Sequence, residues 1–166
     1  MTKLLLWDMD GTLSNDGHRK DLYLNKQYLE YFSYDAQMAD TVYPEARALY
    51  NEMKADGWVM GYLTARLERN RPATTDWLTL HGFDSPETAI LRPEADHIVR
   101  PPRFKAVVIG DIIEHGGYDQ VVMVDNDPLV VERIAADYGD EFVFHADWDQ
   151  HPETASIQNF ILPELA

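Results

Sequence analysis

Two aspartates near the N-terminus, Asp8 and Asp10, are the residues of this sequence with the most evident chemistry. They follow the apolar run 4–6, which is typical of a buried parallel strand, and Gly11 gives the backbone freedom to turn directly after them. Clustered carboxylates repel one another and need a cation, so the pair implies a hard metal ion such as Mg²⁺. A carboxylate beside such an ion can also attack phosphorus.

Residues 7–14, Trp-Asp-Met-Asp-Gly-Thr-Leu-Ser, resemble the first motif of the haloacid dehalogenase (HAD) superfamily, in which Asp-x-Asp-Gly-Thr follows an apolar strand. A bare Asp-x-Asp-Gly pattern also begins an EF-hand calcium loop. That loop needs a Glu at its twelfth position, where this chain has Arg19. The apolar strand before the pattern and three further motifs after it favour the HAD superfamily.

The second motif ends another apolar run, at Thr64, Ala65 and Arg66. A hydroxyl at a strand end, followed by exposed loop amides, can bind phosphate oxygens. This arrangement resembles the second HAD motif, an apolar strand that ends in Thr or Ser. The resemblance implies that Thr64 holds the phosphate and that Ala65 and Arg66 contact the substrate.

Lys105 and the pair Asp125-Asn126 complete the set of motifs. Alone, Lys105 would be interpreted as a solvated surface lysine. In this order it resembles the HAD lysine that neutralises the nucleophile and the phosphate, because clustered anions require compensating cations. The pair at 125–126 resembles the last HAD motif, which supplies metal ligands. Many members have two acids there, but an amide oxygen also binds Mg²⁺, so either Asp125 or Asn126 is expected to bind the metal.

The resemblance covers about residues 4–145 and implies a phosphatase mechanism. Asp8 would attack phosphorus and form an aspartyl-phosphate, while Asp10 would protonate the leaving alcohol and then activate water. The metal would be held by Asp8, by the main-chain carbonyl of Asp10, and by Asp125 or Asn126.

Within the superfamily, the chain looks similar to the phosphatase half of phage polynucleotide kinase/phosphatase. The residues that carry this likeness are His18-Arg19, Thr75…Trp77-Leu78, Leu91-Arg92-Pro93 and the helix around Lys105. The likeness implies that the substrate is a phosphorylated nucleotide or a nucleic-acid 3′-phosphate end, and that His18, Arg19 and Arg92 contact it. Alternatively, His18 is a surface residue and Arg92 pairs with Glu94.

Composition limits the alternatives. The chain has 166 residues, 45% of them hydrophobic, which suffices for one domain over 1–166 with a sizeable core. The absence of cysteine excludes disulfides, thiolate zinc sites and cysteine nucleophiles. No apolar run approaches the roughly 18 residues of a membrane span, and no basic leader precedes the first strand, so we expect a cytoplasmic protein without a membrane partner. No obligate protein partner is evident.

The net charge of −15 opposes broad, non-specific binding to nucleic acid. Half of the 14 basic residues, however, lie between positions 66 and 105, a window that also holds six acids. This basic window comprises Arg66, Arg69, Arg71, Arg92, Arg100, Arg103 and Lys105. It has a net charge of +1 and the rest of the chain −16. Such a distribution suits a small phosphorylated ligand or a nucleic-acid end, although chance clustering on a solvated surface would look the same.

Apolar runs alternate with helical patterns along the chain. Strands are expected at 4–7, 58–63, 88–91, 120–124 and 141–144, and helices at 44–56, 72–80, 102–114 and 128–138. This order predicts an α/β fold, a three-layer Rossmann-like HAD core with a parallel sheet and helices on both faces. Ligands of such sheets bind beyond the carboxyl ends of the strands.

Residues 14–40 break the pattern, since they contain five aromatic residues but no clean strand. The HAD resemblance suggests a small flap there, with minimal or no cap, and hence a comparatively open site. The aromatic residues could equally be ordinary packing. Residues 146–166 are expected to form a C-terminal tail.

Three other functions remain possible. A small-metabolite phosphatase of the same superfamily would use the same motifs. A receiver-like signalling domain also carries a phosphorylated Asp, a Thr and a Lys, but its acid pair precedes that Asp, and its Thr and Lys come later. A phosphotransferase or mutase of the superfamily would need a site closed to water, which the lack of a full cap disfavours.

Overall fold

A five-stranded parallel sheet forms the centre of the computed structural model, which describes residues 1–148. The strands follow the order β5-β4-β1-β6-β7, and every neighbouring pair is parallel. They span Lys3–Trp7 (β1), Val59–Leu67 (β4), Ile90–Arg92 (β5), Gln120–Asp125 (β6) and Val143–His145 (β7). All five expected strands are present, and the predicted α/β fold is confirmed.

The central strand β1 shows why its sequence is a continuous apolar run. Successive side chains of a strand point to opposite faces, and both faces of this sheet are covered. Leu4 and Leu6 therefore belong to one hydrophobic core, and Leu5 and Trp7 to the other. All four side chains are buried.

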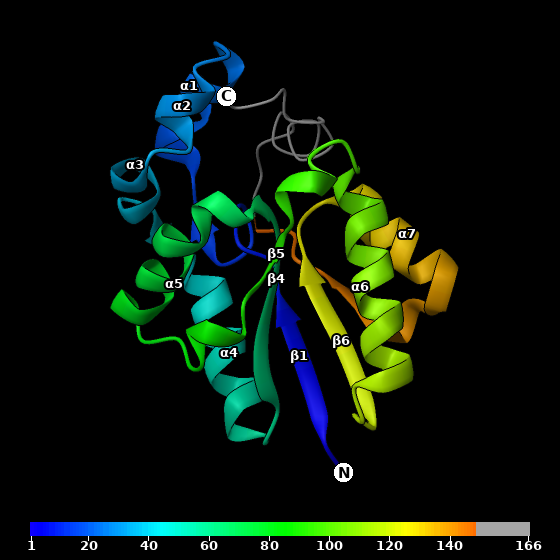
Figure 1. Cartoon of the computed structure of the whole chain (residues 1–166). Coiled ribbons are helices and arrows are strands. Elements are labelled where there is room, and N and C mark those ends of the chain that lie inside the picture. The colour runs from blue at the N-terminus through cyan, green and yellow to red at the C-terminus, as the bar shows by residue number, and fades with distance from the viewer. Residues whose placement is uncertain (149–166) are drawn as a thin grey trace.

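Two pairs of helices cover the two faces of the sheet (Figure 1). On one face lie α4 (Pro44–Ala55) and α5 (Arg71–Leu80), and on the other lie α6 (Pro101–His115) and α7 (Pro128–Tyr138). Each begins with a proline in its first turn, where no intrahelical N–H is needed. Asp127 caps α7, because its carboxylate accepts a hydrogen bond of 2.9 Å from the Leu129 amide.

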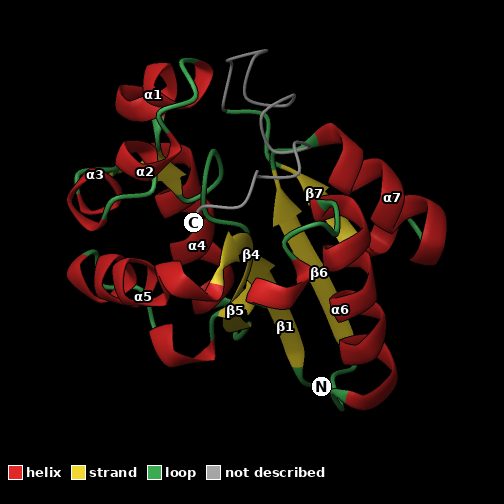
Figure 2. Ribbon diagram, turned by 45° about the horizontal axis from the view of Figure 1, so that its top comes forward, coloured by secondary structure: helices red, strands yellow, loops and turns green. Residues whose placement is uncertain are grey.

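Residues 14–40 form a helical flap at the carboxyl ends of the strands (Figure 2). Its base is closed by β2 (Ser14–Asn15), which pairs antiparallel with β3 (Thr41–Val42). The flap contains α1 (Lys20–Leu24), α2 (Tyr28–Tyr31) and α3 (Tyr34–Met38). Short 3₁₀ helices lie at Gly17–Arg19, Glu68–Asn70, Pro86–Thr88, Glu94–Asp96 and Asp140–Phe142.

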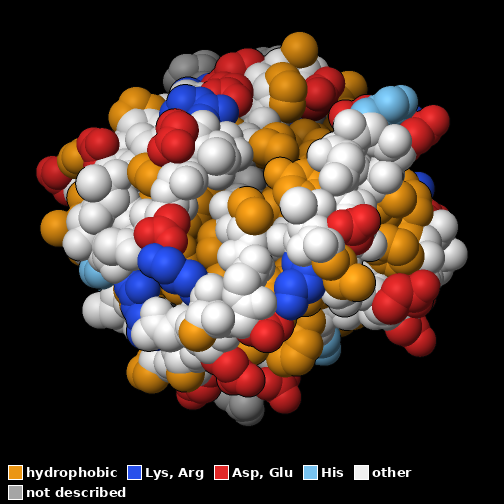
Figure 3. Space-filling view, turned by 90° about the horizontal axis from the view of Figure 1, so that it is seen from below, with side chains coloured by type: hydrophobic (Ala, Val, Ile, Leu, Met, Phe, Trp, Pro, Cys, Tyr) orange, Lys and Arg blue, Asp and Glu red, His pale blue; other side chains and the backbone are white. Residues whose placement is uncertain are grey.

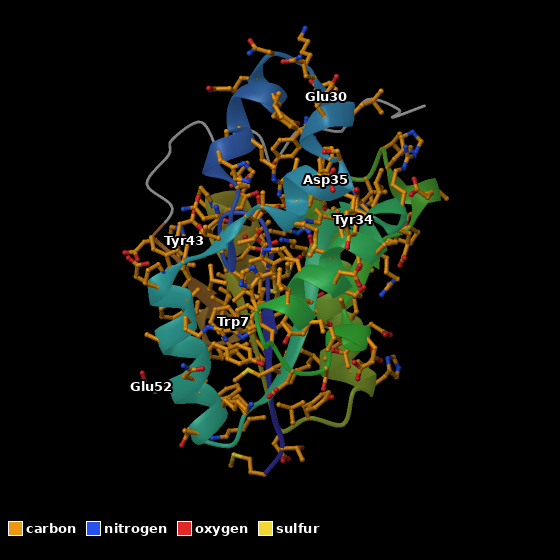
Figure 4. All side chains as sticks on the ribbon, turned by 90° about the vertical axis from the view of Figure 1, so that its left-hand side faces the viewer. Trp7, Glu30, Tyr34, Asp35, Tyr43 and Glu52 are labelled. Carbon is orange, nitrogen blue, oxygen red and sulfur yellow. The ribbon has the colours of Figure 1, made fainter. Side chains whose placement is uncertain are left out.

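The aromatic residues of the flap pack mainly against one another. Tyr23 and Tyr31 are buried in a small cluster of their own, with Tyr28 and Phe32 against them. Tyr34, labelled in Figure 4, lies on the outside, and its hydroxyl donates to Asp76 of α5 over 2.8 Å. Ordinary packing thus accounts for the buried aromatic residues.

Strand β4 continues beyond its expected end at Leu63 and terminates at Leu67. Leu67 pairs with Arg92 of β5, but the register shifts between Leu63 and Leu67. Thr64 therefore lies in an irregular part of the strand and not at its end, which corrects the sequence-based boundary. Extra pairing with β5 is the physical reason for the extension.

The beginning of the expected C-terminal tail packs against the core. Ala146 is buried and its amide donates to the Asp125 carbonyl, while the Trp148 indole donates to the Thr12 carbonyl over 2.8 Å. The remainder of that prediction, 149–166, lies outside the described residues. Within residues 1–148, no helix has the length and apolar character needed to cross a bilayer.

Candidate active site

The chain curls tightly where β1 ends. The Met9 carbonyl accepts hydrogen bonds of 3.0 Å from the amides of Thr12, Leu13 and Ser14, and Gly11 adopts φ +80°. The Asp8 amide donates to the Val124 carbonyl, which ties the end of β1 to β6. The expected turn at Gly11 is confirmed, and it places Asp8 beside the end of β6.

Lys105 lies between two buried carboxylates. Its Nζ is 2.6 Å from Asp8 Oδ1 and 2.6 Å from Asp125 Oδ2, and none of the three side chains is more than 5% exposed. The lysine therefore belongs to the site and is not a surface residue.

One cation for two carboxylates leaves this cluster with excess negative charge. Burial and the neighbouring Asp125 raise the pKa of Asp8 to about 7, although Lys105 opposes the shift. Burial likewise raises the pKa of Asp125. The two carboxylates more than offset the burial of Lys105, so its pKa is raised and it stays protonated.

Thr12 joins Asp8 to the last motif. Its Oγ1 lies 3.0 Å from Asp8 Oδ2 and 3.1 Å from Asn126 Oδ1, and it accepts from the Asn126 amide. Asp125 Oδ1 in turn accepts from the Asp127 amide over 2.9 Å. Sequence reasoning gave Thr12 no role, although it stands within the first motif, and the structure places it between two predicted metal ligands.

Asp10 has the opposite environment, because two arginines hold its carboxylate. Arg66 donates from Nε to Oδ2 over 3.0 Å and from Nη2 to Oδ1 over 2.6 Å, and Arg19 Nη2 donates to Oδ1 over 2.7 Å. Although burial favours the neutral acid, these guanidinium groups outweigh it and hold the pKa of Asp10 well below its usual range. The predicted substrate contacts Arg19 and Arg66 thus bind the predicted proton donor.

Asp40 is a second site residue, besides Thr12, to which sequence reasoning gave no role. Its fully buried carboxylate accepts from Arg19 Nε over 2.8 Å and from Arg19 Nη2 over 2.7 Å, and it lies 3.7 Å from Arg66 Nη2. His18 Nε2 lies 2.8 Å from Asp40 Oδ1, the oxygen that also accepts from Arg19 Nε, so His18 contacts Asp40 and not Asp10. Asp40 belongs to no motif, and only its place at the end of the aromatic segment could have marked it.

The other predicted substrate residues lie around these clusters. Thr64 is buried and its hydroxyl accepts from the Arg66 amide over 3.1 Å, while Ala65 is half-buried. Arg92 is buried as well, but it donates to the backbone carbonyls of Val99 and His97.

Glu94 forms its ion pair with Arg69 and not with Arg92. The structure therefore brings Thr64 and Ala65 next to Arg66, whereas the contacts of Arg92 run to the loop before α6.

The residues present suit a hard divalent cation. Within residues 1–148, no three acidic or histidine side chains are grouped as a ready metal site, because Lys105 lies between Asp8 and Asp125. The same residues nevertheless supply carboxylate and amide oxygens, which Mg²⁺ prefers, and a single lysine faces two buried carboxylates. Asp8, Asp125 and Asn126 therefore fit such an ion.

Comparison with known proteins identifies the fold. No family model and no curated protein matches the sequence. A chain of the Pnkp1/Rnl/Hen1 RNA repair complex matches with a TM-score of 0.63 and 18% identity over 88% of this chain. The class C acid phosphatase from Bacillus anthracis with tungstate bound matches with a TM-score of 0.62 and 14% identity over 96% of this chain and 73% of that one.

This chain spans only 42% of the RNA repair chain that it matches. Another structure of the Bacillus anthracis acid phosphatase gives a TM-score of 0.60 and 11% identity, over 87% of this chain and 66% of that one. At these identities the likeness lies in the fold. The chain shares the α/β fold of these structures, a parallel sheet with helices on both faces, and its acidic motifs lie at the carboxyl edge of the sheet.

Proposed function

We propose that this protein is a Mg²⁺-dependent phosphomonoester hydrolase that works through an aspartyl-phosphate on Asp8. The observation that carries the proposal is the Asp8–Lys105–Asp125 cluster, which lies beside the arginine-held Asp10 at the carboxyl edge of a phosphatase fold. Without metal and substrate the two pKa shifts run against the roles of nucleophile and proton donor, since the pKa of Asp8 is raised and that of Asp10 is lowered. A cation at Asp8 would lower its pKa, and a phosphate at the arginines would raise that of Asp10.

In the first step, an Asp8 carboxylate oxygen bonds to phosphorus as the ester P–O bond breaks, and Asp10 gives its proton to the leaving alkoxide. In the second step, water loses a proton to Asp10 and attacks the same phosphorus. Inorganic phosphate leaves, and the Asp8 carboxylate is restored. Lys105 and Thr12 orient the two oxygens of Asp8 throughout.

The metal would be held by Asp8, by the Asp10 main-chain carbonyl, and by Asp125 or Asn126. When bound, Mg²⁺ would neutralise the charge that accumulates between the nucleophile and the phosphate. Thr64, with the Ala65 segment and Lys105, would hold phosphate oxygens.

Asp10 is a poor proton donor while both arginines hold it, because its pKa is lowered. A bound phosphate dianion would compete for Arg66 and Arg19, since guanidinium groups bind phosphate in the same bidentate manner as carboxylate. Loss of an arginine contact would raise the pKa of Asp10. Substrate binding would thus prepare the acid that protonates the leaving group.

The substrate class that we propose is a nucleic-acid 3′-phosphate end or a phosphorylated nucleotide. Support comes from the fold shared with a chain of an RNA repair complex, and from Arg100 and Arg103 of the basic window, whose side chains are exposed. His18, Arg19 and Arg92 would be further substrate contacts. A small-metabolite phosphatase is the second candidate, favoured by the fold shared with an acid phosphatase.

The test is phosphate release with Mg²⁺ from a panel of substrates, with Asp8→Asn protein as the control for contaminating phosphatase. The panel comprises a 3′-phosphorylated oligonucleotide, 3′- and 5′-mononucleotides, a sugar phosphate and p-nitrophenyl phosphate. We expect the 3′-phosphorylated oligonucleotide to be turned over efficiently. Rapid hydrolysis of the sugar phosphate alone would assign a metabolite phosphatase, and a single phosphorylation without turnover would indicate a receiver domain.

A further inference from the structure

Most of the basic window is already occupied by partners inside the fold. Arg66 binds Asp10, Arg69 pairs with Glu94, Arg71 pairs with Glu68, Arg92 donates to backbone carbonyls, and Lys105 bridges Asp8 and Asp125. Arg100 and Arg103 are the two members whose side chains form no hydrogen bond or ion pair with any residue of the described range 1–148. Both are exposed, so their charges are available to a ligand.

Both arginines line the same open groove of about 690 Å³, which lies between the loop and first turn at the start of α6 and the face of α7 from Leu129 to Ala136. Its apolar surface includes Ile98, which is 63% exposed, and Leu129, which is 46% exposed. Arg133 and Glu132 also line it, and Arg133 is paired with Asp137 over 2.6 Å. The groove therefore combines free positive charge with exposed apolar side chains, on a chain whose net charge is −15.

The groove is lined in part by the first turns of α6 and α7, which lie at the same edge of the sheet as the candidate active site. Arg103 stands two residues before Lys105 on α6, and Arg100 caps that helix, about 8 Å along its axis from Lys105. Leu129 follows the cap Asp127, which comes directly after Asn126. Figure 1 shows α6 and α7 side by side, with their first turns at the carboxyl ends of the strands.

We propose that this groove binds the single-stranded nucleic-acid segment next to the scissile 3′-phosphate, an inference that rests on the proposed function. Arg100 and Arg103 pair with backbone phosphates, and Ile98 and Leu129 contact a base. Single strands offer both a polyanionic backbone and apolar base faces, and their binding sites combine positive charge with surfaces on which bases stack. A sugar phosphate would fill the active site alone and leave the groove empty.

The test compares the Arg100→Ala/Arg103→Ala variant with the wild type. Both side chains are exposed and form no ion pair, so the fold should be retained, which an unchanged Tm would verify. For a 3′-phosphorylated oligonucleotide we expect KM to rise about tenfold with kcat little changed. Both constants should be unchanged for p-nitrophenyl phosphate, which has no strand to place in the groove.

Salt dependence gives a second readout. Each phosphate contact with a single strand contributes about 0.7 to the slope of log affinity against log salt, so losing two contacts should reduce the slope by about 1.4. The matched control is Lys3→Ala/Lys54→Ala, which removes the same charge at the opposite end of the sheet. Figure 3 views that end, where the basic side chains form small separate groups beside acidic ones. The control should leave the oligonucleotide KM unchanged.

An unchanged KM for the oligonucleotide in the arginine variant would overturn the proposal that the groove binds the strand, and it would leave the proposed function intact. An equal rise in the lysine control, or an equal loss with p-nitrophenyl phosphate, would also overturn it, since the effect would then be general. Failure of the wild type to hydrolyse any oligonucleotide, with mononucleotides or sugar phosphates turned over, would instead remove the proposed substrate class and the groove with it.

Discussion

The two aspartates of the first motif stand two residues apart, yet they have opposite electrostatic environments. Asp8 shares one lysine with Asp125, so two buried carboxylates meet a single cation. Asp10 and Asp40 meet two guanidinium groups, those of Arg19 and Arg66, so the charges balance. As a result the pKa of Asp8 is raised to about 7, whereas that of Asp10 is lowered.

The difference follows from which elements supply the partners. The Asp8 cluster is built from β1, β6 and α6, and thus from the rigid core. The Asp10 cluster gathers residues of the turn, the flap and the end of β4. An unbalanced negative cluster is suited to a metal ion, while a balanced cluster can exchange its arginines with a phosphate. Variants and conditions that alter either cluster test this contrast, first through large losses of activity and then through smaller changes in stability.

Asp8→Asn should abolish phosphate release, by more than about 10³-fold, because an amide cannot attack phosphorus. The measurement is steady-state release of phosphate by protein free of contaminating phosphatase. Asp111→Asn, which changes an exposed carboxylate on α6, is the matched control and should retain full activity. Robust turnover by the Asp8 variant would refute the mechanism.

Chelation of divalent cations should remove activity, because the carboxylates of Asp8 and Asp125 would then repel each other and the phosphate of the substrate. Activity should return with Mg²⁺ and return poorly with Ca²⁺, whose larger and looser coordination shell misplaces the nucleophile. Phosphate release after exhaustive dialysis, with each ion added back, checks this. Full activity in the absence of metal would show that Lys105 alone neutralises the site.

Asp10→Asn should reduce hydrolysis of an alkyl phosphate by about 10²–10⁴-fold, the usual contribution of proton transfer. The loss should be smaller for the first step with p-nitrophenyl phosphate, since its leaving group needs little protonation. Rates of phosphoryl-enzyme formation with both esters provide the comparison. An equal loss with both, relative to wild type, would contradict the role of Asp10 as the acid.

Asp40→Asn should leave the two arginines of the Asp10 cluster with one carboxylate in place of two. Removing one partner of a buried ion pair costs about 3–5 kcal/mol of stability, and misplacing Arg19 should lower kcat by up to about 10²-fold. Thermal unfolding and kcat are measured together. Asp56→Asn is the control, because it removes the carboxylate of a surface ion pair with Lys3, its side chain is 66% exposed, and it should have little effect.

The smallest effect concerns the stability of the metal-free protein as a function of pH. Because the pKa of Asp8 in the folded protein exceeds the ordinary value of an aspartate, its contribution to stability is present at low pH and is lost as the pH rises towards about 7. Asp8→Asn should therefore raise Tm by a few degrees at pH 8 and by less at pH 5. Asp10 has a lowered pKa, so its contribution is present near neutral pH, and Asp10→Asn should lower Tm at pH 8. Equal signs for the two variants at pH 8 would contradict the contrast.

The fold was accessible from the sequence because its signals are local. Apolar runs marked all five strands of the sheet, and the prolines and glycines marked the limits of the long helices. The predicted end of β4 was wrong, because the pairing between Leu67 and Arg92 depends on another strand and leaves no local pattern in the sequence.

The site was accessible in part. The motifs supplied Asp8, Asp10, Lys105 and Asp125, and the structure brings three of them within one cluster of ion pairs. Asp40 could not be predicted, because its partner Arg19 is 21 residues away and the flap alone brings them together. The contacts of Arg66 and Arg19 with Asp10 were likewise not predicted from the sequence, because each arginine was interpreted only as a substrate contact.

The central claim, that Asp8 becomes phosphorylated while Asp10 transfers the proton, is tested most directly by trapping the intermediate. Wild-type protein with Mg²⁺ and labelled substrate is quenched in acid during turnover, and the labelled peptide is identified by mass spectrometry. The aspartyl-phosphate mechanism predicts labelled phosphate on Asp8, formed and lost at rates compatible with kcat, and no label in the Asp8→Asn variant. Label on any other residue, or turnover that proceeds without a phosphorylated enzyme, would contradict it.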